Sequence, residues 1–150
     1  MSNKSRRLAE LIQPFLGRSR DARYLAYFDL FNREKFFEAH DVLEDLWLSN
    51  RGSPNSDFYK GLIQLAGGFV HLQKERLRPA AAVLKLAISN LDSYAPEHEG
   101  LDVERVLLLA REKVGELEKE GFQDNPLNDG NAPKLALLQS VAGDVTTAST

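Results

Sequence analysis

Apolar residues recur at spacings of three and four through most of the first 120 residues, the pattern typical of amphipathic helices. No segment alternates between apolar and polar residues as a strand would. The pattern predicts an all-α, single-domain bundle of about five main helices. The expected helices cover residues 5–12, 21–31, 36–49, 53–75, 79–94 and 102–120, of which the first is short.

Capping residues and prolines give the expected helix starts. Asp21 and Asp102 precede apolar-periodic segments and are expected N-caps. Ser53 followed by Pro54 predicts a third start, with proline at the first helical position. Pro79 is expected to open the next helix.

The composition changes after Gly121, where GFQDNPLNDGNAP is rich in turn-forming residues. We therefore expect a bundle domain over residues 1–122 and a loop region over 123–150. A short helix over 134–140 that docks on the bundle is possible within that region. The final AGDVTTAST is expected to be a frayed tail.

The overall composition narrows the function classes. The net charge is −3, so no nucleic-acid partner is expected. One basic cluster near the start is interpreted as a solvated helix face and linker; it consists of Lys4, Arg6, Arg7, Arg18, Arg20 and Arg23. Without cysteine, thiolate catalysis and thiolate metal sites are excluded, and a cytoplasmic location is expected. No apolar run is long enough for a membrane span, and no signal peptide is evident.

The segment FFEAHDVLEDLW, residues 36–47, combines a strongly apolar helix face with a histidine and acidic residues. At 100° per residue, Glu38, Asp41 and Asp45 fall on the polar face and are interpreted as solvated. His40 and Glu44 lie one turn apart, at the border between the polar and apolar faces. A neighbouring helix over this border would partly bury both.

The next segment, YKGLIQLAGGFVHLQKE, is apolar around most of its circumference, which predicts a central helix. One narrow stripe carries Lys60, Gln64, Gly67, Gly68 and His71. Each glycine inside a helix costs on the order of 1 kcal/mol relative to alanine, so a reason for the pair is expected. Either another helix approaches closely, or space is kept for a ligand.

A short connection between these two helices predicts that they are antiparallel neighbours. His40 and Glu44 would then meet Gln64 and His71, with Lys60 and Glu38 at the rim of a polar cleft. Four interpretations stay open. These are a structural hydrogen-bond network, a divalent-metal site of His40, Glu44 and His71, a general-base site in which Glu44 tunes His71, and a pocket that binds a small polar ligand through Lys60.

The two motif segments resemble the family called domain of unknown function 309 (DUF309), over about residues 25–105. The resemblance implies a small all-α, mainly prokaryotic protein without an established activity. The chain departs from the family pattern in two places. It has His40–Asp41 where the family usually has His-Glu. After the second histidine it has ERLRPAA, where the family often has a Gly-Asn step and a Gly-Ala pair. The positions that match the motif are Phe37, Glu38, His40, Glu44, Trp47, Gly61, Leu62, Ile63, Gln64 and His71.

Two functions therefore compete. In the first, the polar cleft binds a small ligand or a divalent metal. In the second, the polar cluster only fixes helix packing and the chain acts through protein–protein contacts or as a homo-oligomer. Phe37, Leu48 and Leu109 are the expected contact residues of that second function, because their helix positions point outward.

Overall fold

The computed structural model describes residues 2–138, and the predicted all-α bundle is confirmed. None of the helices in this range is long and apolar enough to cross a bilayer. Two 3₁₀ segments, η1 (Gln13–Phe15) and η2 (Asp92–Tyr94), and a small hairpin of β1 (Glu97–His98) and β2 (Leu101–Asp102) complete the described elements. The six α-helices are α1 (Asn3–Ile12), α2 (Ala22–Asn32), α3 (Phe36–Leu48), α4 (Ser56–Gln73), α5 (Leu77–Leu91) and α6 (Val103–Lys119).

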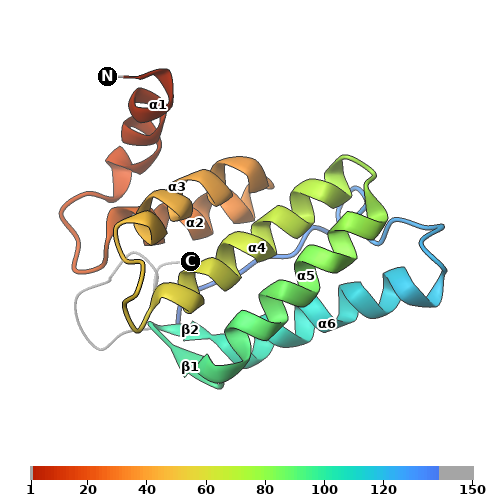
Figure 1. Ribbon diagram of the computed structural model, residues 1–150. Coiled ribbons are helices and arrows are strands. Elements are labelled where there is room, and N and C mark those ends of the chain that lie inside the picture. Colours follow the sequence, from red (N-terminus) through yellow and green to blue (C-terminus); the bar gives the residue numbers. More distant parts are fainter. Residues whose placement is uncertain (1, 139–150) are drawn as a thin grey trace.

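Helix α4 is central, as its apolar circumference predicts. It packs against α3 on one side and α5 on the other, while α2 packs on α3 and α6 on α5 (Figure 1). The start of α3 meets the end of α4, where the rings of Phe36 and Phe69 stack with centroids 5.2 Å apart. The two motif helices are therefore antiparallel neighbours, as predicted.

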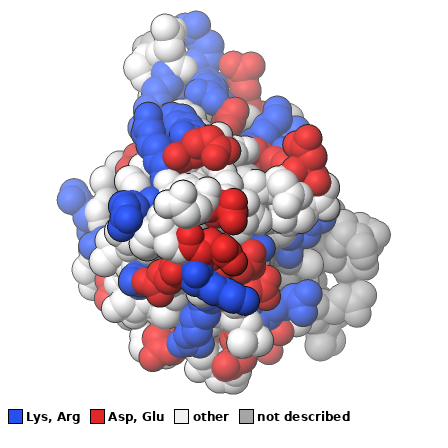
Figure 2. Space-filling model, turned by 90° about the vertical axis from the view of Figure 1, so that its right-hand side faces the viewer, with Lys and Arg blue, Asp and Glu red and all other residues white. Residues whose placement is uncertain are grey.

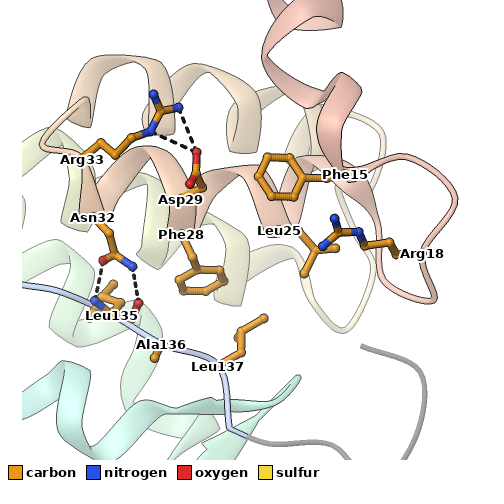
Figure 3. Close-up of a pocket in the computed structure, with 10 residues that line it drawn as sticks. All are labelled: Phe15, Arg18, Leu25, Phe28, Asp29, Asn32, Arg33, Leu135, Ala136 and Leu137. Carbon is orange, nitrogen blue, oxygen red and sulfur yellow. Dashed lines mark hydrogen bonds and ion pairs between the residues drawn. The ribbon is translucent and has the colours of Figure 1, made fainter. Parts of the chain in front are cut away.

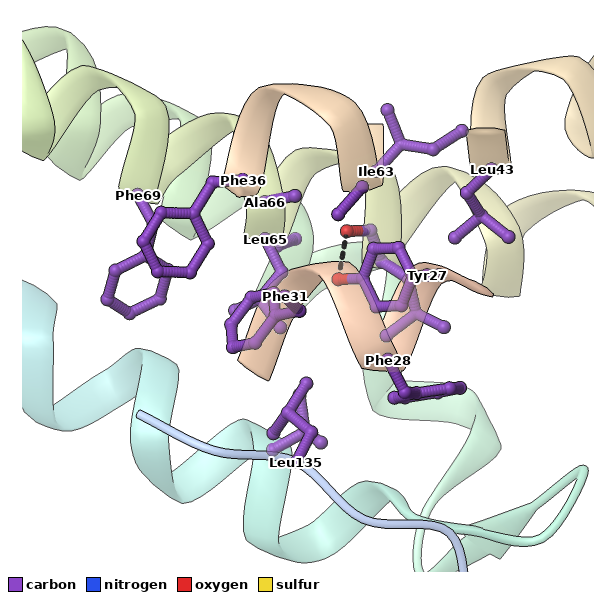
Figure 4. Packing of buried hydrophobic residues seen from close by; sticks show 14 of the residues in the cluster. Tyr27, Phe28, Phe31, Phe36, Leu43, Ile63, Leu65, Ala66, Phe69 and Leu135 are labelled. Carbon is purple, nitrogen blue, oxygen red and sulfur yellow. Dashed lines mark hydrogen bonds between the residues drawn. The ribbon is translucent and has the colours of Figure 1, made fainter. Parts of the chain in front are cut away.

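Aromatic side chains fill the junction of α2, α3 and α4 (Figure 4). Tyr27, Phe31, Phe36 and Phe69 are fully buried there. The one polar group of this cluster is satisfied, because the Tyr27 hydroxyl donates a hydrogen bond of 2.7 Å to the carbonyl oxygen of Leu62. This packing fixes the relative positions of the two helices that carry the motif.

Two predicted N-caps are confirmed. Asp21 accepts from the backbone N–H of Arg23 at 2.8 Å, and Asp102 accepts from that of Arg105 at 3.0 Å. The predicted start at Ser53 is wrong. The chain makes a further turn there, closed by the Ser56 N–H on the Ser53 carbonyl at 3.1 Å, and α4 begins only at Ser56.

Two other expectations are corrected. Helix α5 begins at Leu77 rather than at Pro79, because proline is tolerated within the first turn of a helix. Residues 134–138 are not helical. They run as an extended segment, with Leu137 forming an isolated β-bridge to Leu101. Residues 139 and 140 of the expected short helix, and the tail after them, lie outside the described residues.

Candidate ligand-binding site

Three side chains on one face of α3 come close enough to share a cation. His40, Asp41 and Glu44 each offer a ligand atom, and these atoms all lie within 4.8 Å of one another. His40 Nδ1 and Asp41 Oδ1 are 3.2 Å apart. Glu44 follows His40 by four residues and Asp41 by three, spacings at which the side chains of a helix are neighbours. Asp41 was interpreted from the sequence as part of the solvated face, so the sequence reasoning missed it.

Helix α1 lies over this face of α3, which is why Asp41 is less solvated than its helix position alone predicts. Lys4 Nζ is 3.6 Å from Glu44 Oε1, and Arg7 Nη2 is 3.0 Å from Glu38 Oε2. The Arg7 guanidinium also stands 6.0 Å from the centre of the Phe37 ring. The N-terminal basic cluster is thus partly paired with acidic residues of α3, rather than simply solvated. Only tertiary structure could have revealed this pairing.

A cavity of about 380 Å³ lies between α1 and α3, and Asp41 is its one acidic lining residue. The Asp41 side chain is only 14% exposed, whereas that of Asp45 is 49% exposed. No side chain of α1 is buried, so this helix rests on the bundle without being part of its core. In Figure 1, α1 projects from the rest of the molecule.

The glycines of α4 have different neighbours. A Cβ at Gly68 would lie 2.5 Å from Leu84, so Gly68 allows the close approach of α5. A Cβ at Gly67 would instead lie 3.6 Å from Val83 and 4.0 Å from His40 Cδ2, which are ordinary contact distances. Gly67 is therefore not required by packing. It forms the floor between His40 on α3 and Val83 on α5.

The remaining residues of the predicted cleft lie along the same stripe of α4. Gln64 is turned toward α5, where its Oε1 accepts from Asn90 Nδ2 at 2.7 Å. Lys60 is exposed, as expected for the rim. His71 lies one turn beyond Gly67 and is not among the residues that converge with His40, Asp41 and Glu44.

The environment of His71 disfavours its charged form. Burial lowers its pKa, and the nearby charges of Arg76 and Lys74 lower it further. Its Nδ1 is buried and has no hydrogen-bond partner among the described residues. His71 is therefore a neutral imidazole near neutral pH, which is the form that can accept a hydrogen bond or bind a metal.

Acidic and basic side chains are interspersed over the face of the molecule shown in Figure 2. Basic side chains near the top of that view lie against acidic ones. This arrangement agrees with the α1–α3 ion pairs, in which local charges compensate one another instead of forming a surface of one sign.

The comparison with known families agrees with the motif. Residues 24–83 match the model of the family described as a domain of unknown function, DUF309. The predicted resemblance to DUF309 is thereby confirmed. The matched range runs from α2 to the middle of α5 and contains His40, Asp41, Glu44, Gly67 and His71. No curated protein and no solved structure matches the chain.

Proposed function

We propose that this chain binds a divalent cation through His40, Asp41 and Glu44 on α3. The convergence of their ligand atoms within 4.8 Å carries the proposal. The site differs from the sequence-based set of His40, Glu44 and His71 in that Asp41 takes the place of His71. His71 remains a candidate to accept a hydrogen bond from a ligand placed over Gly67.

The ligand set indicates the class of ion. One imidazole and two carboxylates suit Zn²⁺, Mn²⁺ or Fe²⁺ better than the harder Ca²⁺. Bonds of about 2.1 Å in a six-coordinate ion put neighbouring ligands about 3 Å apart. The three side chains would have to close by about 1–2 Å, which rotation of the long Glu44 side chain allows. Three protein ligands leave positions open for water or for a small polar ligand.

The proposal gives α1 a role in binding. Lys4 already neutralises part of the charge of Glu44 at 3.6 Å, so a cation must compete with Lys4 for this carboxylate. Both groups are partly exposed, so the competing ion pair is weak, worth up to about 1 kcal/mol. A divalent ion held by three ligands would win this competition and loosen one of the contacts that hold α1.

Space beside His40 also supports the proposal. Position 67 is a glycine inside a helix, although a methyl group would fit there. An alanine there would favour the helix by about 1 kcal/mol. A ligand that binds the cation and extends over Gly67 toward Gln64 and His71 gives a reason for the bare backbone.

The test is thermal unfolding of chelator-treated protein with added Mn²⁺, Zn²⁺ or Fe²⁺, the last under anaerobic conditions. An ion that binds the native state raises the unfolding midpoint by linkage. Glu44→Gln should abolish the shift, whereas Glu38→Gln should retain it. These substitutions are matched, because each removes one carboxylate from α3 that pairs with a cation of α1. Equal shifts in both variants, or none in the wild type, would contradict the proposal.

A second candidate function is supported by exposed apolar side chains on α3. Phe37 and Leu48 are each 49% exposed, as their helix positions predict. The expectation that Leu109 points outward is wrong, because Leu109 is partly buried against the core and its neighbour Leu108 is the exposed residue, at 60%. If α3 mediates self-association, sedimentation should show a dimer that dissociates on Leu48→Asp. A monomer at all concentrations would rule this function out. A reducing cytoplasm remains the proposed setting for either function.

A further inference from the structure

The extended segment of residues 134–138, called the strap below, lies on the bundle between α2 and the start of α6. Leu135 and Leu137 are 5% and 8% exposed, whereas the strap residues on either side of them are exposed. This alternation is that of a strand with one buried face. The strap thus inserts two leucines into the core, and Figure 4 shows Leu135 pointing toward Phe31 of α2.

The bundle holds the strap through its backbone as well as through these leucines. Asn32 Nδ2 donates to the Leu135 carbonyl at 2.6 Å, and the Leu135 N–H donates to Asn32 Oδ1 at 2.7 Å (Figure 3). Further along, the Leu138 N–H donates to the Gly100 carbonyl of the β1–β2 hairpin at 2.6 Å. Main-chain hydrogen bonds combined with alternate buried side chains are the features of peptide binding by strand addition.

A third contact favours a particular residue at the first position of the strap. Lys134 Nζ donates to the backbone carbonyl of Asn32 at 2.9 Å. Asn32 is the last residue of α2, and carbonyl groups at the end of a helix lack a partner within it and carry a partial negative charge. A lysine is therefore favoured here, and the groove as a whole fits an extended Lys-Leu-x-Leu sequence.

The strap can leave this groove while the helices stay folded. The strap residues from 135 to 137 line a hollow of about 320 Å³ beside α2 and another of about 310 Å³ beside the start of α6, so the strap is flanked by space on both sides. Residues 120–133 connect it to α6 and are rich in turn-forming residues. Segments with few packed neighbours are those that open locally without global unfolding.

We propose that the groove between α2 and α6 binds an extended Lys-Leu-x-Leu segment of another protein, and that the strap fills this groove in cis. Because it is covalently attached, the strap competes at an effective concentration on the order of 1 mM. A strap that occupies the groove in nine molecules of ten lowers the apparent affinity for a partner about tenfold. Displacement of the strap thus controls partner binding. The proposal does not depend on the cation site of α3.

The probe is a capped, fluorescent peptide with the sequence of residues 131–138, NAPKLALL, and its binding to the full chain is followed by anisotropy. Leu135→Asp places a charge at a buried position of the strap, so the groove should open and the variant should bind the peptide about tenfold more tightly than the wild type. Leu138→Asp is the matched control. It makes the same change at a strap residue that is 39% exposed, and it should bind like the wild type. A peptide that carries Leu135→Ser and Leu137→Ser should not bind.

The groove is tested by a second substitution in the Leu135→Asp chain. Asn32→Ala should weaken peptide binding about tenfold or more, because two hydrogen bonds are lost. Asn90→Ala is the control for this change. Asn90 is also a helical asparagine bonded to a neighbouring helix, at 2.7 Å from Gln64, but it lines neither hollow, so peptide binding should be unchanged.

A measurement on the wild type keeps the test independent of how Leu135→Asp folds. Excess peptide should move the ¹⁵N amide signals of residues 136–138 to the positions of an unfolded segment. Unchanged strap signals at saturating peptide would overturn the proposal. So would equal binding of the serine-substituted peptide, or equal weakening by Asn32→Ala and Asn90→Ala. A wild-type dimer in sedimentation that Leu135→Asp dissociates would also overturn it, because the occupant would then be the strap of a second copy.

Discussion

The adjacent glycines of α4 should respond oppositely to alanine. At Gly67 a new methyl group would lie 3.6 Å from Val83 and 4.0 Å from His40, without a clash. The variant should gain the helix propensity of alanine, about 1 kcal/mol. At Gly68 the same methyl would lie 2.5 and 2.6 Å from two carbons of Leu84. Because Leu84 is fully buried, it cannot turn away into solvent.

The helix-propensity gain of alanine can be compared with the overpacking cost at Gly68. Overpacking of a core typically costs about 1–3 kcal/mol, and contacts this short place Gly68→Ala at the upper end. After the helix gain is subtracted, Gly68→Ala should lower the free energy of unfolding by about 1–2 kcal/mol. The two variants should therefore differ by about 2–3 kcal/mol, or roughly 4–12 °C in midpoint for a chain of this size.

The assay is urea unfolding of Gly67→Ala and Gly68→Ala beside the wild type, followed by helical circular dichroism. Both variants make the same chemical change one residue apart, so each is the control for the other. If both destabilise by the same amount, Gly67 is needed for packing and the account of the floor between α3 and α5 is refuted. If both stabilise, the close approach of α5 at Leu84 is wrong.

Three further predictions concern single side chains. Tyr27→Phe should lower the free energy of unfolding by about 1 kcal/mol in urea unfolding, because one buried hydrogen bond to Leu62 is lost; no change would mean that this bond adds nothing. Burial lowers the pKa of His71, so the unfolded chain binds more protons there, and stability should fall as the pH drops below about 6.5. His71→Gln should lose less stability than the wild type between pH 7.5 and 5.5, and an equal or larger loss would refute the assignment. Asp21→Ala should cost about 1 kcal/mol near pH 7 through loss of the helix cap. The hydrogen bond from Arg23 lowers the pKa of Asp21, so this cost should persist above pH 4 and shrink below it, and a pH-independent cost would contradict that.

The helices and their pairing could be predicted because both depend on local pattern. The apolar spacing of α4 marks a buried helix, and a short connection to α3 leaves an antiparallel arrangement as the simple solution. Asp21 and Asp102 were predicted as caps because a capping side chain needs only its own next few residues. Ser53 failed as a cap because the chain makes one more turn, and sequence alone does not show where such a turn ends.

The candidate site was only partly predictable. His40 and Glu44 follow from their one-turn spacing on α3. Asp41 did not, because its burial depends on α1, which is about 30 residues away in sequence and docks through ion pairs and partly buried apolar side chains. The extended segment at Leu135 was missed for a similar reason. Its partner is the side chain of Asn32, and a contact over this sequence distance leaves no periodic signal.

The most direct test of the proposed cation site is the effect of substoichiometric Mn²⁺ on the amide signals of the ¹⁵N-labelled chain. A bound paramagnetic ion broadens signals from nearby residues first. The account predicts that broadening begins at His40, Asp41 and Glu44, reaches Gly67, and disappears in Glu44→Gln but not in Glu38→Gln. Broadening that begins elsewhere, for example among the acidic residues at the end of α6, or that is the same in both variants, would contradict it.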